Sequence, residues 1–275
     1  MKKLLIRTLS SIVYAAIVAA GLLINKYCFL AFILLVTVLM MNEFQKMSLG
    51  KKYPVQQVIT ILAGLSVPAA VFGIEAFGWN TSVLAFLFIG LFAICASLLF
   101  LKDRSQLSDA FALFASILYL AIPMSIFNLG VFSDGSFSGI YVLVMFCIVA
   151  MSDVGGYVFG MAIGQKYGRR LCPSISPKKT WTGVWGGIVF SIATALFFYK
   201  IGWLSLPLTH VIVLAILIDV AGVFGDLIES IWKRFYNLKD SGNIIPGHGG
   251  MMDRFDSALI AIPMGIVYLI LFNLI

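Results

Sequence analysis

The segment from Ser230 to Asp256 reads SIWKRFYNLKDSGNIIPGHGGMMDRFD. It contains four of the 19 basic residues of the chain, three of its 12 acidic residues and one of its two histidines. The chain as a whole is 61% hydrophobic and only 11% charged, and the long runs on either side of the segment are mostly apolar. Such a local concentration of polar residues predicts a functional site rather than a solvated loop with helix-capping charges.

Two acidic residues close the segment. Asp253 and Asp256 are three positions apart, so on a helix they would share one face. Two carboxylates on one face repel each other unless a cation or a proton lies between them. Because hard divalent cations such as Mg²⁺ prefer oxygen ligands of this kind, the spacing predicts a metal site.

Basic and flexible residues precede this acidic pair. The basic side chains are those of Lys233, Arg234 and Lys239. His248 adds a group that can donate or accept a hydrogen bond and can change its protonation state. The glycines beside it, Gly247, Gly249 and Gly250, let the backbone approach a ligand closely. Together with metal-binding carboxylates, these features suit a phosphate or pyrophosphate ligand.

The whole segment resembles the C-terminal signature of phosphatidate cytidylyltransferases (CDP-diacylglycerol synthases), with no departure over its 27 positions. The matching residues are Ser230, Lys233-Arg234, Lys239-Asp240, the run from Pro246 to Gly250, Asp253-Arg254 and Asp256. The resemblance implies transfer of CMP from CTP to phosphatidic acid, with Mg²⁺ as cofactor and release of pyrophosphate. The resemblance leaves open whether a second cation binds beside Mg²⁺.

The composition predicts an integral membrane protein. The mean hydropathy is +1.04, and apolar runs of roughly 18 to 25 residues recur, the length at which a helix spans a bilayer. Strands of a membrane barrel would be about half as long and would alternate in polarity. We therefore expect an all-α, polytopic helix bundle of about nine transmembrane helices. The expected spans are about 5–24, 28–44, 54–77, 82–101, 108–131, 138–163, 182–201, 208–228 and 256–274.

These spans form a single integral membrane domain over residues 1–275 in our interpretation. Residues 1–135 or so would be an N-terminal helical scaffold, and residues 136–275 the catalytic half. Acidic residues of the first five spans, among them Glu43 and Glu75, lie near span ends, where water is expected to reach them. A scaffold role, or assembly into a homodimer, is the expectation for these spans.

The distribution of basic residues predicts the orientation. With the N-terminus in the cytoplasm, 17 of the 19 basic residues fall on the cytoplasmic side, and only Lys26 and Lys200 fall outside. This bias is the one that the positive-inside rule requires. It places Ser230–Asp256 in the cytoplasm, where CTP is. We expect the protein to lie in the bacterial inner membrane, with its active site facing the cytoplasm. Although the net charge is +7, charges placed in this way indicate a lipid bilayer, and not nucleic acid, as the partner.

Two features of the chain have simpler readings. The first 24 residues have a basic start like that of a signal peptide, but their apolar region is long for that role and a second apolar run follows at once. We expect an uncleaved first span. The four cysteines form no CxxC pair and are expected to be reduced structural thiols.

The sixth span carries an acid at membrane depth. Asp153 lies well inside it, and such a carboxylate by default marks a functional group or a buried partner. Gly156, Gly160 and Gly164 recur every four residues in the same span. No strand precedes them, so we interpret them as sites of close helix packing and not as a nucleotide-binding loop.

The loop from Gln165 to Thr180 ends in SPKKT, which resembles another segment of the same family. Ser176, Lys178 and Lys179 lie beside a hydroxyl at the expected start of a helix. Charge and free backbone amides there predict contact with a phosphate. The alternative is ordinary positive charge on a cytoplasmic loop.

The eighth span contains Asp219 and Asp226, seven positions apart and so on one face. Asp226 belongs to GDLIES, which resembles the family's GDLxES segment, and this makes it the stronger metal candidate. Glu229 and Lys233 are four positions apart, and a simple helix ion pair explains that spacing.

The family resemblance implies a role for each of these positions. Asp226, Asp253 and Asp256 would bind Mg²⁺ and, with His248 and Lys239, form the catalytic group. The substrate-binding residues would be Asp153, Ser176, Lys178, Lys179, Lys233, Arg234, Gly249, Gly250 and Arg254. Two alternatives stay open: a cytidylyltransferase for another lipid phosphate, and an ion-coupled transporter whose path is lined by the membrane acids.

Overall fold

The computed structural model describes residues 2–99, 109–133, 135–245, 247 and 249–275, with the backbone alone for residues 2–7. The chain forms two compact units. The first consists of Met1–Ser138 and Leu238–Arg254, and the second of Gly139–Asn237 and Phe255–Ile275. The first unit therefore includes most of the Ser230–Asp256 segment.

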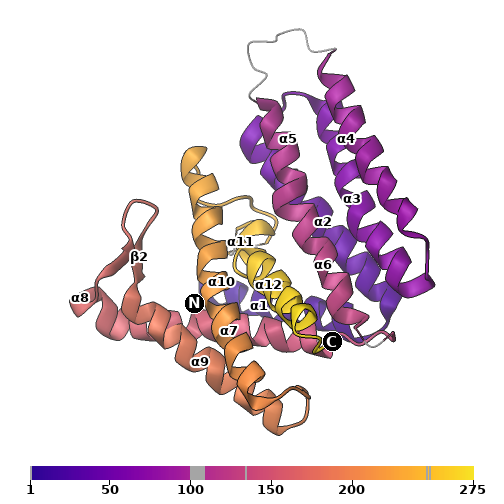
Figure 1. The fold of residues 1–275 in the computed structure, drawn as a ribbon. Coiled ribbons are helices and arrows are strands. Elements are labelled where there is room, and N and C mark those ends of the chain that lie inside the picture. The colour runs from indigo at the N-terminus through magenta and orange to yellow at the C-terminus, as the bar shows by residue number, and fades with distance from the viewer. Residues whose placement is uncertain (1, 100–108, 134, 246, 248) are drawn as a thin grey trace. The chain divides into compact units, whose positions relative to one another are not determined.

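Helices make up the first unit. They are α1 (Lys2–Leu23), α2 (Lys26–Leu49), α3 (Pro54–Phe77), α4 (Ala85–Leu98), α5 (Ala110–Ser116) and α6 (Ile122–Val131). Helix α1 packs on α2, α2 on α3, and α3 on both α4 and α6 (Figure 1). Asn25 separates α1 from α2, and its side chain accepts hydrogen bonds at 2.9 Å from the backbone of Tyr27 and Cys28. This N-cap explains the predicted tight hairpin.

Short irregular helical turns join some of these helices. A 3-10 turn at Thr81–Leu84 leads into α4, and a π-helical turn at Ile117–Ala121 connects α5 to α6. The π-helical turn lies just before Pro123, which has no N–H to donate to a regular helix.

Small residues and lipid-facing aromatics characterise the packing of α4. A Cβ atom at Gly90 would lie 2.4 Å from the Cβ of Ala63 on α3, so only glycine permits this approach. Phe86, Phe88 and Phe92 of the same helix are between 64% and 75% exposed. Large apolar side chains exposed at this density suit contact with lipid.

The second unit carries five helices and a hairpin. The elements are α7 (Ile140–Phe159), a π-helical turn (Gly160–Gly164), α8 (Gln165–Tyr167), β1 (Arg170–Cys172), β2 (Ser176–Thr180), α9 (Trp181–Lys200), α10 (Leu208–Phe235) and α12 (Ala258–Leu271). Helix α7 packs on α9, and α10 packs on both α9 and α12 (Figure 1). A further short helix, α11 (Met252–Phe255), precedes α12.

Glycines make the contact between α7 and α9 close. A Cβ at Gly155 would lie 2.4 Å from the carbonyl oxygen of Gly186. In the π-helical turn that follows α7, a Cβ at Gly164 would lie 2.4 Å from the Oγ1 of Thr182 on α9. At Gly156 and Gly160 a Cβ would meet only ordinary contacts, at 3.6 and 3.7 Å. The predicted packing role is therefore confirmed at Gly164, whereas Gly156 and Gly160 line a cavity described below.

The predicted fold class is confirmed. Among the described residues, eight helices are long and apolar enough to cross a membrane, and a shorter apolar helix covers Thr8–Leu23. Each of the nine expected spans coincides with one of them. All four cysteines are free, as expected. The single-domain interpretation and the homodimer stay predictions.

One local expectation needs correction. The region from Gln165 to Thr180, expected to be a loop, contains a two-stranded antiparallel hairpin in which Arg170 pairs with Thr180 and Cys172 with Ser176. Pairing satisfies backbone groups that an irregular loop would leave to solvent. Hydropathy does not detect strands this short.

Candidate active site

A cavity of about 510 Å³ opens within the second unit, bounded by α7, α9, α10 and the β1–β2 hairpin. Its volume falls in the range of roughly 300 to 1,000 Å³ that is typical of small-molecule sites. Glycine and apolar residues form much of its wall. The charged residues on that wall are Asp153, Lys178, Lys179, Asp219 and Asp226.

The hairpin positions the two lysines of this cavity. Thr180 ends β2 and caps α9, because its side chain accepts a hydrogen bond of 3.2 Å from the backbone of Gly183. The side chain of Gln165 donates to the carbonyl of Lys178 at 2.8 Å and accepts from Arg170 at 2.6 Å. Lys178 is exposed at the cavity, and Lys179 is half-buried. The predicted hydroxyl at a helix start is thus confirmed as Thr180.

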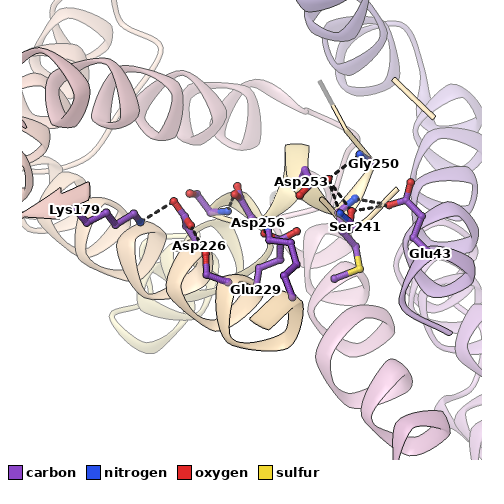
Figure 2. A network of polar contacts seen from close by, with 12 residues as sticks. Glu43, Lys179, Asp226, Glu229, Ser241, Gly250, Asp253 and Asp256 are labelled. Atoms are coloured by element: carbon purple, nitrogen blue, oxygen red, sulfur yellow. Dashed lines mark hydrogen bonds and ion pairs between the residues drawn. The ribbon is translucent and has the colours of Figure 1, made fainter. Parts of the chain in front are cut away.

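Lys179 contacts a predicted metal ligand. Its Nζ lies 2.7 Å from the Oδ2 of Asp226 on α10 (Figure 2). The Oδ1 of Asp226 accepts a hydrogen bond of 3.2 Å from Ser230, one turn further along α10. The side chains of Lys179 and Asp226 are 27% and 29% exposed, so water and a polar ligand can reach both.

A glycine brings Asp256 beside Asp226. A Cβ at Gly225 would lie 2.4 Å from the carbonyl oxygen of Asp256, so only glycine lets α10 approach this turn so closely. Asp256 is half-buried and lies near Asp226 (Figure 2). It interacts electrostatically with Asp226, Asp153 and Lys233. Carboxylates gathered in this way repel one another, and their oxygen donors fit a hard divalent cation.

The expectation that Asp253 and Asp256 share one helix face is wrong. Helix α11 ends at Phe255, and Asp256 and Ser257 form a turn before α12 begins at Ala258. The carboxylate of Asp256 accepts a hydrogen bond of 2.6 Å from the backbone of Ser257, which competes with the helical pattern. Asp253 belongs to the first unit and Asp256 to the second. Within the described residues, no three His, Cys, Asp or Glu side chains are grouped so that they could hold a metal ion.

In the first unit, Asp253 organises the segment that precedes it. Its Oδ2 accepts hydrogen bonds from the backbone of Ser241 at 2.9 Å, the hydroxyl of Ser241 at 2.9 Å and the backbone of Gly250 at 2.8 Å (Figure 2). Gly249 has a φ of +83°, and a Cβ there would lie 2.5 Å from Asp253. This glycine therefore serves the approach of Asp253; its predicted contact with a ligand stays a prediction.

Sequence reasoning missed Glu43, which lies on α2. The expectation that water reaches it is wrong, because only 4% of it is exposed. Its carboxylate accepts hydrogen bonds from the backbone of Met251 at 2.8 Å, the backbone of Met252 at 2.9 Å and the hydroxyl of Ser241 at 3.3 Å (Figure 2). Glu43 lies three positions after Met40, which is buried, so the two share one face of α2. An acid on such an apolar face could have indicated a buried hydrogen-bond partner.

The remaining predicted residues have varied surroundings. Lys233 forms the expected ion pair with Glu229, which is fully buried. Arg234 and Lys239 are exposed, and Ser176 is half-buried in β2. The carbonyl of Arg254 accepts a hydrogen bond of 3.3 Å from Tyr14. His248 lies outside the described residues.

Asp219 links helices of the second unit. It is fully buried, and its Oδ1 accepts a hydrogen bond from the hydroxyl of Ser152 on α7. A Cβ at Gly187 would lie 2.3 Å from the same oxygen, so α9 also approaches it closely. Its Oδ1 thus joins α10 to α7 beside α9, whereas its Oδ2 is buried with no hydrogen-bond partner in the part of the chain that the structure describes.

Comparison with known proteins identifies the family of the chain. Phosphatidate cytidylyltransferases of Staphylococcus epidermidis and Staphylococcus haemolyticus are 31% and 30% identical to the chain over 260 residues, which are 94% of this chain and 96% of each relative. The phosphatidate cytidylyltransferase of Bacillus subtilis is 44% identical over 128 residues, 46% of either chain. Residues 5–272 match the model of the Cytidylyltransferase family. The chain belongs to the cytidylyltransferase family.

Proposed function

We propose that this protein is a phosphatidate cytidylyltransferase, which transfers CMP from CTP to phosphatidic acid and gives CDP-diacylglycerol and pyrophosphate. The observation that carries the proposal is the cavity of the second unit, where Lys178 and Lys179 lie with Asp226 and Asp153 among helices long enough to cross a membrane. The names of the relatives support the same reaction.

The cavity suits both substrates. Phosphatidic acid lies in the bilayer with its phosphate at the surface, whereas CTP arrives from the aqueous side. Lys178 and Lys179 on the hairpin, with Lys233 and Arg234 near the end of α10, would hold phosphate groups by charge and hydrogen bonding. Lys239 would add to this set. These cations screen the repulsion that otherwise keeps two phosphates apart.

The reaction is an in-line displacement at phosphorus. An oxygen of the lipid phosphate attacks the α-phosphorus of CTP and forms a new P–O bond. The bond from the α-phosphorus to the oxygen that bridges it to the β-phosphorus breaks, and pyrophosphate leaves with the electron pair. No covalent enzyme intermediate is needed. His248 would orient a phosphate or protonate a leaving oxygen.

The acidic residues fit a divalent cation. Asp226 and Asp256 offer oxygen donors whose mutual repulsion a cation would relieve. They would hold Mg²⁺, with Asp253 as a third candidate ligand. A bound Mg²⁺ would supply charge stabilisation for the phosphate oxygens and the leaving pyrophosphate. Lys179, paired with Asp226, would keep one cation beside this group.

The orientation follows from charge. With the N-terminus in the cytoplasm, the hairpin and the 238–254 segment face the cytoplasm, where CTP is available. We place the protein in the bacterial inner membrane, in accord with its bacterial relatives. Basic residues on that side would also attract anionic lipid.

An assay with purified protein tests the proposal. Labelled CTP and Mg²⁺ are incubated with phosphatidic acid or with other lipid phosphates, and pyrophosphate and the liponucleotide are measured. We expect release of pyrophosphate only when phosphatidic acid is present. Release with a different lipid phosphate alone would assign another substrate, and no lipid-dependent release with any of them would reject the proposed reaction.

A further inference from the structure

The 238–254 segment has little regular structure of its own. Between the end of α10 and the start of α11, its described residues form one isolated backbone bridge, between Ile245 and Gly249. Its shape must therefore depend on side chains that bind its backbone. The segment carries Asp253, which the proposed function names as a candidate metal ligand, and Gly249 and Gly250, for which the family resemblance implies substrate binding.

One side chain from a distant helix binds this segment at several points. Glu43 of α2 accepts hydrogen bonds from Met251, Met252 and Ser241, through both of its carboxylate oxygens. The backbone N–H groups of Met251 and Met252 lie at the beginning of α11, where no intrahelical carbonyl is available to them. Glu43 supplies the missing acceptors, and charged acceptors form the stronger hydrogen bonds.

The fit around Glu43 is close. A Cβ at Gly250 would lie 2.5 Å from its Oε2, and a Cβ at Gly242 would lie 2.7 Å from its Oε1. Any other residue at Gly250 or Gly242 would displace the carboxylate or the segment. Gly242 and Gly250 thus leave room for the carboxylate of Glu43.

Ser241 connects Glu43 to Asp253. Its hydroxyl lies 3.3 Å from the Oε2 of Glu43 and 2.9 Å from the Oδ2 of Asp253 (Figure 2). A hydroxyl has one hydrogen, so the two carboxylates share a single donor. The backbone N–H groups of two neighbouring residues also bind one carboxylate each: Gly250 donates to Asp253, and Met251 donates to Glu43. The position of Glu43 therefore restrains the plane of the Asp253 carboxylate.

We propose that Glu43 is a positioning residue for the cytidylyl transfer reaction: its buried carboxylate holds residues 250–252 and, through Ser241, orients Asp253. The proposal rests on the proposed function, because it assigns Glu43 to that reaction. Glu43 does not itself touch the substrate. It acts through Asp253, a residue predicted to bind the cation.

The test compares Glu43→Gln with Glu75→Gln, a control at an exposed acid on α3 of the same unit. Gln keeps the size of Glu43 but presents an NH₂ group to backbone donors. We expect kcat to fall about 10- to 100-fold, as is typical when a residue that supports a ligand is lost. The Mg²⁺ concentration for half-maximal activity should rise several-fold, with the KM for CTP little changed. Glu75→Gln should leave all three quantities unchanged.

Hydrogen exchange provides a readout that needs no activity. In Glu43→Gln, backbone amides of residues 241–245 and 249–255 should exchange faster, whereas those of α9 should not change. Ser241→Ala should reproduce part of both effects. The double variant should lose less than the product of the single losses, because both residues act on Asp253.

Several results would overturn the proposal. Unchanged kinetics and exchange in Glu43→Gln would do so, and so would a lower thermal midpoint with unchanged kcat and Mg²⁺ dependence, since that pattern describes a residue of purely structural importance. If Glu43→Gln does not fold, Glu43→Asp and Ser241→Ala decide in the same way. A wild-type protein without lipid-dependent pyrophosphate release would instead reject the proposed function, while the exchange experiment would still report whether Glu43 holds the segment.

Discussion

The Nζ of Lys179 lies 2.7 Å from the Oδ2 of Asp226, and this ion pair joins the β1–β2 hairpin to α10 at the wall of the cavity. The pair combines a predicted phosphate ligand with a predicted metal ligand. Both side chains are more than a quarter exposed, so the pair itself contributes little stability. Because the pair lies at the cavity wall, we expect it to matter for substrate binding more than for stability.

Changing Lys178 and Lys179 both to Gln should therefore separate activity from stability. Loss of a charged contact to a phosphate costs about 1.5 to 3 kcal/mol, so we expect kcat/KM to fall at least roughly tenfold. The free energy of unfolding should change by less than about 1 kcal/mol, because the ion pair is partly solvated. Kinetics and thermal unfolding in detergent measure both quantities.

Lys52→Gln provides the matched control. Lys52 also forms an ion pair, with Asp109 at 3.1 Å, but it belongs to the first unit and does not line the cavity. We expect full activity in this variant. If the double variant at Lys178 and Lys179 were equally active, these lysines would be topological signals only.

Asp256→Asn and Asp253→Asn should differ in their effects on stability. Both should abolish turnover, because Asn lacks the negative charge that a divalent cation needs. Asp256→Asn removes repulsion from Asp226 and Asp153, so we expect an unchanged or higher thermal midpoint. In Asp253→Asn the oxygen that accepts three hydrogen bonds loses its charge, and we expect a loss of about 1 to 3 kcal/mol.

Measurement of Mg²⁺-dependent activity beside thermal unfolding decides this prediction. Asp109→Asn, at an acid outside the cavity, is the control and should remain active. Near-normal activity of Asp256→Asn and Asp253→Asn at saturating Mg²⁺ would exclude these carboxylates as essential ligands.

The close approach of α10 to the turn at Asp256 predicts a contrast between two glycines. In Gly225→Ala the new Cβ would lie 2.4 Å from the carbonyl of Asp256, so the turn must move. We expect a loss of about 1 to 3 kcal/mol, as in other overpacked sites. Activity should fall as well, since Asp256 would shift relative to Asp226.

Gly222→Ala, one turn earlier on α10, is the control. Its Cβ would meet Ser257 at 3.6 Å, an ordinary contact. Alanine is also the better helix former, by up to about 1 kcal/mol. We expect unchanged activity and equal or higher stability. Equal behaviour of the two variants in unfolding and turnover assays would contradict a role for Gly225 in placing Asp256.

Reporter fusions test the orientation. A reporter that is active only outside the cytoplasm should give signal when fused after residue 275 and none when fused after residue 240. The expectation follows from the predicted nine spans and from the 17 basic residues on one side. Signal at residue 240, or its absence at residue 275 in a stably expressed fusion, would contradict the nine-span topology.

Hydropathy and local motifs were enough for the helices and the family. Each span is a continuous apolar run, and its length is set by the thickness of the bilayer. The GDLIES and SPKKT segments are contiguous in the chain, so their resemblance to the cytidylyltransferases could be seen without a fold. The same local information also predicted the Glu229–Lys233 pair and the cap at Thr180, which involve neighbours within one helical turn.

The contacts that organise the site could not be predicted in this way, because they join residues far apart in the chain. Glu43 meets Ser241 across 198 positions and Met252 across 209. No periodicity within either segment indicates the other. The turn at Asp256 likewise depends on Gly225 of another helix, and the shared helix face expected from the spacing of Asp253 and Asp256 does not form. The sequence by itself determined which residues are chemically capable, and tertiary packing decided which of them meet, because a buried carboxylate is stable only where the fold brings donors to it.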